Sequence, residues 1–251
     1  MLICNDSADK LMKYGARILA MKPIYIEDSY IKSFDTLVSA VEGDGVILEA
    51  TAFYPQSGGQ PSDLGSLFRD GEEFKVLRVE LPGSLHILDK PGLAVGDKVS
   101  GRIDWDRRYR FMRSHTACHI LSSIIFNATG AKITGNQIDS AKSRVDFSLE
   151  TFDKSRIATY VDEVNRIISE DHAVKTSLLP RAEAMSIPDL VRLAMDVPDR
   201  EEIRVVEVEG VDKQACGGTH VRSTGEIRGI KLVKAENKGK SNRRVYFELA
   251  E

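Results

Sequence analysis

Two pairs of residues in this chain have the types and the spacing of metal ligands. His115 and His119 are four residues apart, and Cys216 and His220 have the same spacing further along. In a helix, positions four apart lie on one face with Cβ atoms about 5–6 Å apart, so two such imidazoles can share one ion. The chain has 5 histidines, and three of them fall in these two pairs. The pairs together predict one metal site.

The donor set of this site is typical of zinc. Three imidazoles and one thiolate suit a tetrahedral Zn²⁺ ion. Gly217 and Gly218 allow the tight turn that would bring Cys216 and His220 to the same point. Four protein ligands are typical of a closed structural site, whereas a catalytic site keeps one position open. The pattern leaves both possibilities open, but it disfavours a zinc peptidase, because the residues between His115 and His119 include no glutamate base.

The other histidines and the cysteine between the paired histidines receive simpler interpretations. Cys118 is interpreted as a small buried helix residue. His86 and His172 have no partner at ligand spacing, and both are interpreted as surface or structural residues.

The residues from Pro23 to Asp104 have the pattern of short strands. Turn signals such as Gly43-Asp44-Gly45, Pro82-Gly83 and Gly96-Asp97 separate short apolar runs, a spacing that predicts a small barrel or sandwich. The expected strands are 35–41, 46–50, 74–81, 85–88 and 98–103.

The pattern changes near Trp105 to alternating helices and strands. Asp106 is expected to cap a helix that runs to Asn127 and stops at Gly130. A second helix is expected over 153–171, short helices over 181–186 and 188–194, and strands over 144–149, 173–179, 202–209, 227–235 and 243–249. The fold class is therefore α+β: residues 1–22 form an N-terminal extension, 23–104 a small β-barrel domain, and 105–251 an α+β domain with helices on a mainly antiparallel sheet. Residues 1–20 are helix-like, and the sequence leaves open whether they are an extension or precede a start at Met21.

The composition is that of a globular protein. Apolar residues make up 42% and charged residues 29% of the chain, and no apolar run reaches the roughly 20 residues needed to span a membrane. Three cysteines cannot form a disulfide framework, which indicates a reducing compartment and a cytoplasmic location. The net charge of −3 argues against a protein that simply coats nucleic acid, but not against a local basic patch.

Three sequence blocks resemble the editing domain of alanyl-tRNA synthetase and its free-standing relatives, the AlaX proteins. The blocks are Arg113-Ser-His-Thr-Ala-Cys-His119, Ala215-Cys-Gly-Gly-Thr-His220, and the loop Phe53–Gly65 that contains Ser57-Gly58-Gly59-Gln60. The family usually has glycine where this chain has Ser57. The resemblance covers about residues 23–249 and fits the medium-length form, which has a barrel and an editing domain but no aminoacylation domain.

The resemblance implies zinc-dependent trans-editing of mischarged tRNA(Ala). Such a hydrolase cleaves the ester of seryl-tRNA(Ala) and glycyl-tRNA(Ala), with one Zn²⁺ per chain, and it requires neither a membrane nor an obligate protein partner. A pocket built for alanine cannot strongly exclude serine or glycine, so a second site must correct the error. By resemblance, Thr134 contacts the serine side chain and Gln60 positions water or the terminal ribose. Gly58, Gly59 and Arg113 are then expected to bind substrate.

Two basic groups are candidates for phosphate contacts. They are Arg107, Arg108, Arg110 and Arg113 in the first, and Lys231, Lys234, Lys238, Lys240, Arg243 and Arg244 in the second. Two other functions remain open from the sequence: a tRNA-binding module with a structural zinc and no hydrolase activity, and a zinc hydrolase that acts on small esters.

Overall fold

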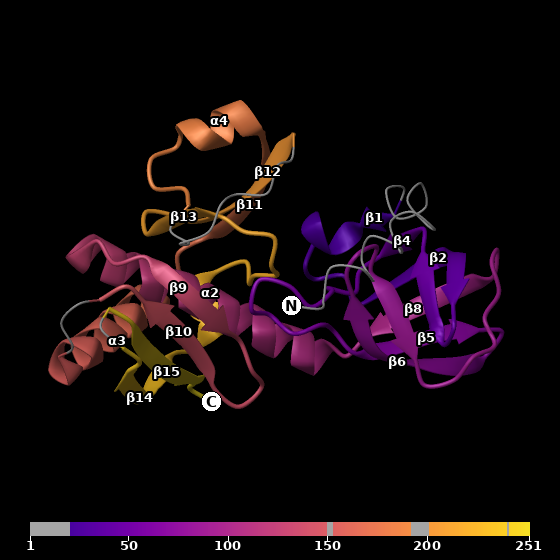
Figure 1. The fold of residues 1–251 in the computed structure, drawn as a ribbon, viewed down its shortest axis with the longest axis horizontal. Helices are drawn as coiled ribbons and strands as arrows, with labels where there is room; N and C mark the ends of the chain where they lie inside the picture. The colour runs from indigo at the N-terminus through magenta and orange to yellow at the C-terminus, as the bar shows by residue number, and fades with distance from the viewer. Residues whose placement is uncertain (1–20, 150–152, 192–200, 240) are drawn as a thin grey trace. The chain divides into compact units, whose positions relative to one another are not determined.

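The computed structural model describes residues 21–149, 153–191, 201–239 and 241–251 (Figure 1). The helix-like segment expected over residues 1–20 lies outside the described residues. The chain separates into two compact units: the first takes the described residues up to Ser57 and Pro61–Arg108, and the second takes Gly58–Gln60 and Tyr109–Glu251. The predicted fold class, a small barrel followed by an α+β domain, is confirmed. The boundary between residues 104 and 105 stays a prediction.

The first unit contains a closed antiparallel barrel, which settles the choice between barrel and sandwich. Its strands follow the order β2-β3-β7-β6-β5-β8 around the barrel. Their bounds are Ser33–Glu42 (β2), Gly45–Leu48 (β3), Gly65–Arg69 (β5), Glu72–Glu80 (β6), Leu85–Leu88 (β7) and Lys98–Ile103 (β8). A short parallel pair, β1 (Lys22–Pro23) with β4 (Ala50–Thr51), and the 3-10 helix η1 (Ile24–Ile26) complete this unit. Alternate strand residues such as Leu67, Phe74 and Val76 fill the interior.

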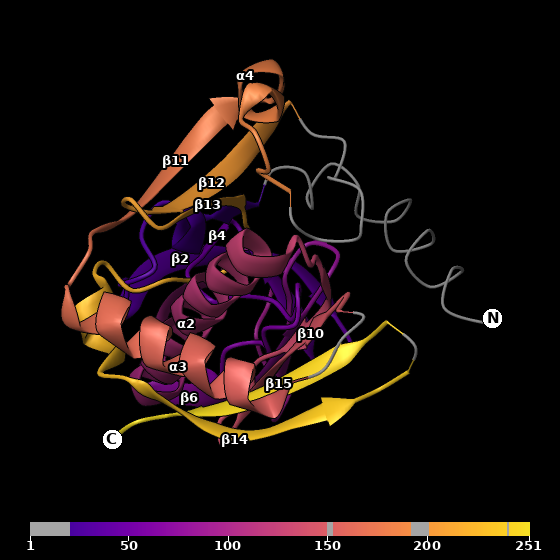
Figure 2. The ribbon, with the colours of Figure 1, turned by 90° about the vertical axis from the view of Figure 1, so that its left-hand side faces the viewer.

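The second unit packs helices against two antiparallel sheets (Figure 2). One sheet has the order β14-β15-β10-β9, with bounds Ile230–Asn237, Arg243–Leu249, Ser143–Phe147 and Ile133–Gln137. The other has the order β11-β12-β13, with bounds Val174–Pro180, Glu202–Val208 and Asp212–Ala215. The helices are α2 (Trp105–Thr129), α3 (Lys154–Ser169), α4 (Arg181–Ser186) and the 3-10 helix η2 (Thr224–Ile227).

Helix α2 carries the first histidine pair through the interior of the second unit. Every residue from Ser114 to Ser123 is buried, so the whole circumference of this stretch is covered by protein. The helix begins two residues earlier than expected, at Trp105. Asp104 rather than Asp106 accepts a first-turn amide, that of Arg107, at 3.2 Å, and Gly130 ends the helix in a left-handed conformation.

Arg108, at the start of α2, belongs to the interior of the first unit. Its guanidinium is fully buried, hydrogen-bonds the carboxylate of Asp63, and donates to the carbonyl of Ser29 at 2.9 Å. A buried, paired guanidinium cannot reach a phosphate, so the expectation of a tRNA contact is wrong for this residue.

Other differences from the expected elements are local. Residues 188–191 are not helical, and the rest of the expected helix 188–194 lies outside the described residues. The strand expected from Ile227 begins at Ile230, because η2 occupies the preceding turn. None of the helices in the described ranges is long and apolar enough to cross a membrane.

Candidate metal centre

Four side chains converge within the second unit. One ligand atom from each of His115, His119, Cys216 and His220 lies within 4.8 Å of the others. The Cys216 sulfur is 3.6 Å from Nε2 of His115 and 3.4 Å from Nε2 of His220. Bonds of about 2.0–2.3 Å to a tetrahedral zinc place ligand atoms roughly 3.3–3.7 Å apart. The observed spacing therefore fits a single tetrahedral ion of this size.

Each of the three imidazoles is held through its Nδ1 atom. Nδ1 of His115 donates to the side-chain oxygen of Gln60 at 2.9 Å, and Nδ1 of His119 donates to Asp212 at 3.0 Å. Nδ1 of His220 lies 3.0 Å from the hydroxyl of Thr116, whose own proton goes to the carbonyl of Met112. A ring that donates from Nδ1 presents the lone pair of Nε2 to a metal. The residues present therefore fit a zinc ion.

Charge in the cluster favours a thiolate. Burial opposes ionisation of Cys216, but the neighbouring His115 and His119 outweigh it and lower the pKa of this thiol well below its usual value. Burial would likewise lower the pKa of His119, yet hydrogen bonds to Asp212 and Cys216 raise it to about 10. The thiolate is the form of cysteine that binds metals.

The turn that carries Cys216 is fixed by an arginine and by a close glycine contact. The buried guanidinium of Arg204 donates to the carbonyls of Cys216 and Gly218, both at 2.8 Å. A Cβ atom on Gly218 would lie 2.1 Å from the His115 ring, whereas one on Gly217 would meet nothing within 4 Å. Only the second of the two glycines is therefore required by packing against the cluster.

The Gly58–Gln60 turn packs directly against the cluster. Gln60 is fully buried, and its amide nitrogen donates to the hydroxyl of Thr219 at 2.9 Å. Two hydrogen bonds fix the turn to β9 and to the residue that follows it. The side-chain amide of Asn136 donates to the carbonyl of Gly58 at 3.0 Å, and the backbone amide of Ile138 donates to the carbonyl of Gly59 at 2.8 Å. Gly59 has a φ of 80°, and a Cβ there would lie 2.6 Å from Asn136. The predicted loop and the predicted ligands thus meet.

Thr134 and Arg113 have surroundings of a different kind. Thr134 is exposed on β9, and its hydroxyl donates to the side chain of Asn242 at 3.2 Å. Arg113 is half-buried, and its guanidinium donates to the backbone carbonyls of Ile227 at 2.8 Å and Ala250 at 3.1 Å. These bonds hold η2 and the chain end to α2. The substrate roles of both residues stay predictions.

Several residues that shape the centre had no sequence signal. Asp212 and Arg204 are isolated polar residues in β13 and β12, and Thr116 reads as one more residue in a helix. Asp212 and Arg204 come together because β12 and β13 pair along Val205↔Ala215 to Val208↔Asp212.

The remaining histidines and Cys118 are structural. His86 is fully buried in the barrel between the Thr51 hydroxyl at 2.8 Å and the carbonyl of Val46 at 3.2 Å, and burial lowers its pKa to about 4. His172 pairs with Glu170 at 2.9 Å. Cys118 is buried, which raises its pKa to about 12 and makes it an inert thiol, as interpreted from the sequence.

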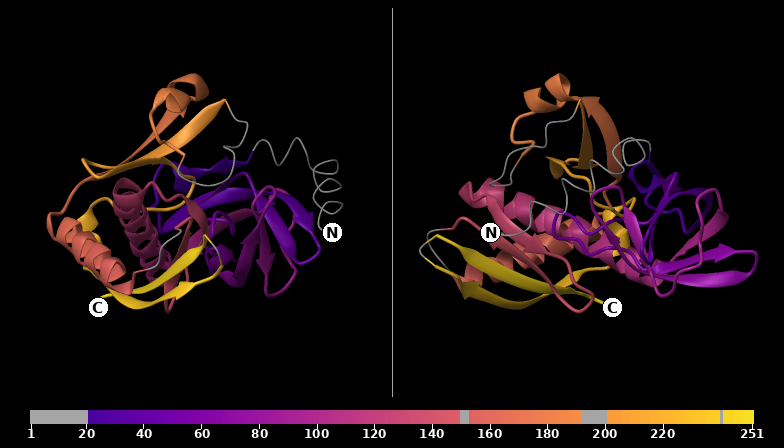
Figure 3. Two further views of the ribbon diagram at one scale, coloured as in Figure 1. Left: turned by 60° about the vertical axis from the view of Figure 1, so that its left-hand side comes forward. Right: turned by 45° about the vertical axis from the view of Figure 1, so that its right-hand side comes forward.

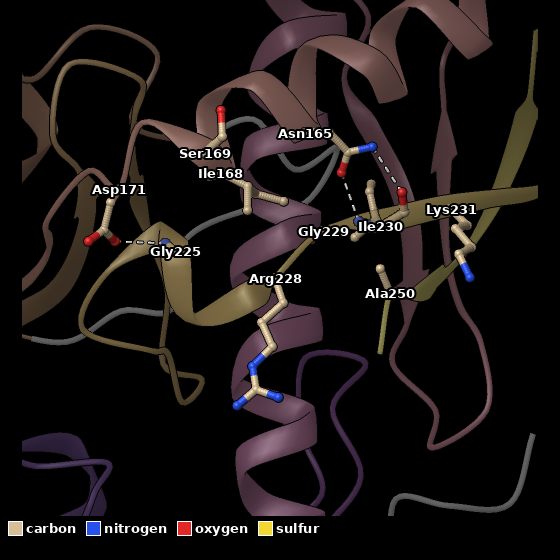
Figure 4. A pocket seen from close by; sticks show the side chains of 10 residues that line it. All are labelled: Asn165, Ile168, Ser169, Asp171, Gly225, Arg228, Gly229, Ile230, Lys231 and Ala250. Carbon is tan, nitrogen blue, oxygen red and sulfur yellow. Dashed lines mark hydrogen bonds between the residues drawn. The ribbon is translucent and has the colours of Figure 1, made fainter.

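A separate pocket of about 690 Å³ lies at the end of α3 and the start of β14. Figure 4 shows the amide of Asn165 bonded to both backbone groups of Ile230, and the carboxylate of Asp171 bonded to the amide of Gly225. Arg228 and Lys231 are its cationic lining residues. Its lining contains none of the metal-ligand candidates, so it is distinct from the centre.

Comparison with known proteins identifies the family. Residues 203–246 match the family model described as the threonyl and alanyl tRNA synthetase second additional domain, and residues 6–107 match that of class II (A) tRNA synthetases. The alanyl-tRNA editing protein AlaX-M of Methanosarcina mazei is 50% identical over 239 residues, which cover 90% of this chain and 95% of the relative. The chain belongs to the AlaX-M family.

Other relatives agree with this membership. The AlaX-M protein of Saccharolobus solfataricus is 45% identical over 230 residues, which cover 89% of this chain and 97% of the relative. The alanine–tRNA ligase of Pyrococcus abyssi is 38% identical over 236 residues, which cover 92% of this chain but 26% of the ligase. An AlaX-M chain thus corresponds to one part of a much longer ligase, as the three sequence blocks predicted.

Proposed function

We propose that this chain is a trans-editing hydrolase of mischarged tRNA(Ala) that acts in the cytosol. It cleaves the ester bond between a wrong amino acid and the terminal ribose, so that water adds to the carbonyl and tRNA(Ala) leaves with its hydroxyl restored. The observation that carries the proposal is the four-ligand cluster locked to the Gly58–Gln60 turn, in a chain half identical to a protein named for alanyl-tRNA editing.

The metal we assign to the cluster is one zinc ion. His115, His119, Cys216 and His220 would hold it, and when bound it would supply Lewis acidity to the ester. Three of the four ligands are buried and Cys216 is half-buried. The side of the cluster at Cys216 is therefore where a substrate would approach.

The contacts of Gln60 support a positioning role for this residue. Its oxygen accepts from His115 and from the amide of Thr219 at 3.2 Å, and its nitrogen donates to the Thr219 hydroxyl. Every polar atom of the side chain is engaged within the protein. Gln60 would thus fix the orientation of His115 and the position of the loop rather than touch the ester itself.

Thr134 supplies the discrimination in this proposal. Its proton goes to Asn242, so its oxygen lone pairs are oriented to accept a hydrogen bond from a serine hydroxyl. Alanine has no hydroxyl to donate, and a site that gains energy from a substrate hydroxyl discriminates strongly against analogues without one. Glycine editing would need a different contact, since glycine also lacks the hydroxyl.

Deacylation of seryl-, glycyl- and alanyl-tRNA(Ala) tests the function. The expected order of rates has seryl-tRNA(Ala) fastest and alanyl-tRNA(Ala) spared, with loss of activity in His119→Ala. The variant Thr134→Val should slow seryl-tRNA(Ala) about tenfold, the value of one hydrogen bond, and leave the glycyl ester unchanged. Equal slowing of both esters would rule out recognition of the serine hydroxyl.

One observation favours a second candidate, a tRNA-binding module with a structural zinc. Four protein ligands around one ion are the usual arrangement of a closed structural site. Under this alternative the wild-type chain binds tRNA(Ala) and leaves every ester intact. The third possibility, a hydrolase of small esters, predicts that removing the tRNA body leaves the rate unchanged.

A further inference from the structure

The sheet β14-β15-β10-β9 has one face packed on helices and one face that none of the described helices of this unit covers (Figures 2 and 3). Val145, Phe147, Val245 and Phe247 point inward and are fully buried. Residues directly opposite each other in neighbouring strands share a face, as do residues two apart in one strand. The registers Arg144↔Tyr246 and Lys234↔Tyr246 therefore place these three side chains in one row on the outer face.

A second row on the same face holds the acidic partners. Asp146 lies opposite Arg244, which lies opposite Glu236. Each carboxylate is shared by two cations: Asp146 accepts from Arg144 at 2.7 Å and from Arg244 at 2.6 Å, and Glu236 pairs with Lys234 and with Lys238 at 3.0 Å. Sharing orients the cations but leaves positive charge in excess.

The outer-face cluster is therefore basic in a chain that is acidic overall. Its five cations, opposed by Asp146 and Glu236, are Lys142, Arg144, Lys234, Lys238 and Arg244. Further along the same face Lys231 lies opposite Glu248, which adds one charge of each sign and leaves the excess of cations unchanged. The net charge of the whole chain is −3. A local excess of cations on such a chain indicates a surface that attracts a polyanion.

Tyr246 holds the cations of this cluster in place. The ammonium groups of Lys234 and Lys142 lie 4.7 Å and 5.5 Å from the ring centroid, and the guanidinium of Arg244 lies 5.9 Å from it. A ring that attracts three cations reduces the freedom that long side chains would lose on binding. The cluster is thus an ordered array of donors on a rigid sheet.

We propose that the outer-face cluster docks the phosphodiester backbone of tRNA. The inference rests on the proposed function for the identity of the RNA, but it assigns a surface that the metal centre does not include. Paired guanidinium forks and ammonium groups on a flat sheet are the donors that phosphate oxygens require. Such contacts carry no sequence information, so this surface would bind tRNA without selecting its bases.

Binding of uncharged tRNA(Ala) at several salt concentrations tests the inference. The double variant Lys142→Gln, Arg144→Gln should weaken binding about tenfold at low salt. It should also make the negative slope of the log association constant against log salt shallower by about two, one for each lost phosphate contact. The single variant Lys142→Gln should make this slope shallower by about one. Lys142 lies in the turn between β9 and β10, so this change is tolerated even if loss of Arg144 disturbs the sheet.

The matched control is Lys175→Gln, Lys213→Gln on the other sheet of the same unit, where Lys175 pairs with the exposed Glu209 and Lys213 with the partly exposed Glu207. It changes the net charge equally and should leave both affinity and slope unchanged. Equal effects in the two double variants, or no effect in either, would overturn the inference. Polyglutamate of equal charge tests whether any polyanion binds in the same way. If it binds the wild-type chain as tightly as tRNA does, the inference is also overturned.

These outcomes separate the inference from the proposed function. Uncharged tRNA has no ester, so the binding result does not depend on hydrolysis. A wild-type chain that fails to hydrolyse seryl-tRNA(Ala) while the Lys142 variants lose binding would refute the function and support the surface. Full hydrolysis with binding insensitive to Lys142 and Arg144 would support the function and refute the surface.

Discussion

The three imidazoles of the metal centre are held by three different acceptors: an amide oxygen, a carboxylate and a hydroxyl. Of these, Asp212 is the only charged one, and its side chain is fully buried. It also accepts from the amide of Gln214 at 2.9 Å, which fixes the carboxylate in place. A carboxylate behind a ligand histidine both orients the ring and increases its basicity.

Replacing Asp212 should weaken metal binding more than replacing either neutral acceptor. We expect Asp212→Ala to lower zinc affinity about 10–100-fold, because His119 loses both its orientation and its charged partner. Competition with a chelator measures this directly, without any assay of hydrolysis. Glu207→Ala, on the neighbouring strand and paired with Lys213, is the control and should bind zinc normally. An unchanged affinity in Asp212→Ala would contradict the assigned role.

The two adjacent glycines of the cysteine turn should differ in their tolerance of alanine. In Gly218→Ala the new methyl would lie 2.1 Å from His115. We expect this variant to lose about 1–3 kcal/mol of unfolding free energy and to bind zinc more weakly, because the ring must move. Gly217→Ala should behave as wild type within about 0.5 kcal/mol, since its Cβ enters open space. Calorimetry with and without zinc compares the two, and equal effects would count against the close approach.

At this scale the four side chains that converge could be predicted, but most of the residues that hold them could not. Spacing of four in a helix and a Cys-Gly-Gly turn are local signals that survive without knowledge of the fold. Asp212, Arg204 and Asn136 act through contacts with residues far away in sequence, to His119, Cys216 and Gly58 respectively. Such contacts exist only once the strands have paired, so no local pattern could indicate them.

At the scale of elements, a buried ion pair ties the start of α2 to the barrel segment. Arg108 and Asp63 are both fully buried, and Asp63 also accepts from the amide of Tyr54 at 2.6 Å. The remaining donors of Arg108 go to the carbonyls of Ser29 and Ala52. One guanidinium therefore connects α2 to three separate stretches of the first unit.

Removing one partner of this pair should be costly. We expect Asp63→Ala to lower the unfolding free energy by about 3–5 kcal/mol, because it leaves the Arg108 charge buried without its counter-ion. Denaturant titration measures the change. Arg166→Ala is the control: its pairs with Glu163 and Glu170 are exposed, so its loss should change the unfolding free energy far less than Asp63→Ala does. A similar cost in both variants would contradict the assigned importance of burial.

Elements with strong local patterns were predicted to within a residue or two. The bounds of β7, β8, α4 and β15 match the expected segments. For β7 and β8, the turn residues Pro82-Gly83 and Gly96-Asp97 lie just before the strand and indicate where it begins. Strands β9 and β13 were not predicted. Each is short and has at most two apolar residues, and each is extended because it pairs with a stronger strand, β10 or β12.

At the scale of the whole molecule, one contribution to the pH dependence of stability comes from a single buried histidine, His86. The pKa of His86 is lowered from 6.5 to about 4 by burial in the barrel. Between these values the unfolded chain binds a proton at His86 that the folded chain does not, so stability rises with pH across this window. The contribution is fully present above pH 6.5 and is lost towards pH 4, by about 3 kcal/mol in total.

Comparison with His86→Gln should isolate this contribution. The difference in unfolding free energy between wild type and variant is expected to shrink as pH falls from 7 to 4.5, because only the wild type must protonate a buried imidazole. Any release of a bound metal by acid would affect both proteins equally and cancel in the difference. A difference that stays constant over this range would contradict the assignment. The NMR signal of the His86 ring should likewise not titrate above about pH 5.

The three-residue turn that carries Gln60 is encoded within the barrel segment, but it folds with the second unit. A gene cut at residue 105 would therefore yield a fragment whose His115 lacks its amide partner, however well that fragment folded. Transfer of the proposed editing activity to another protein, in nature or in the laboratory, would have to move both segments together as one inherited block.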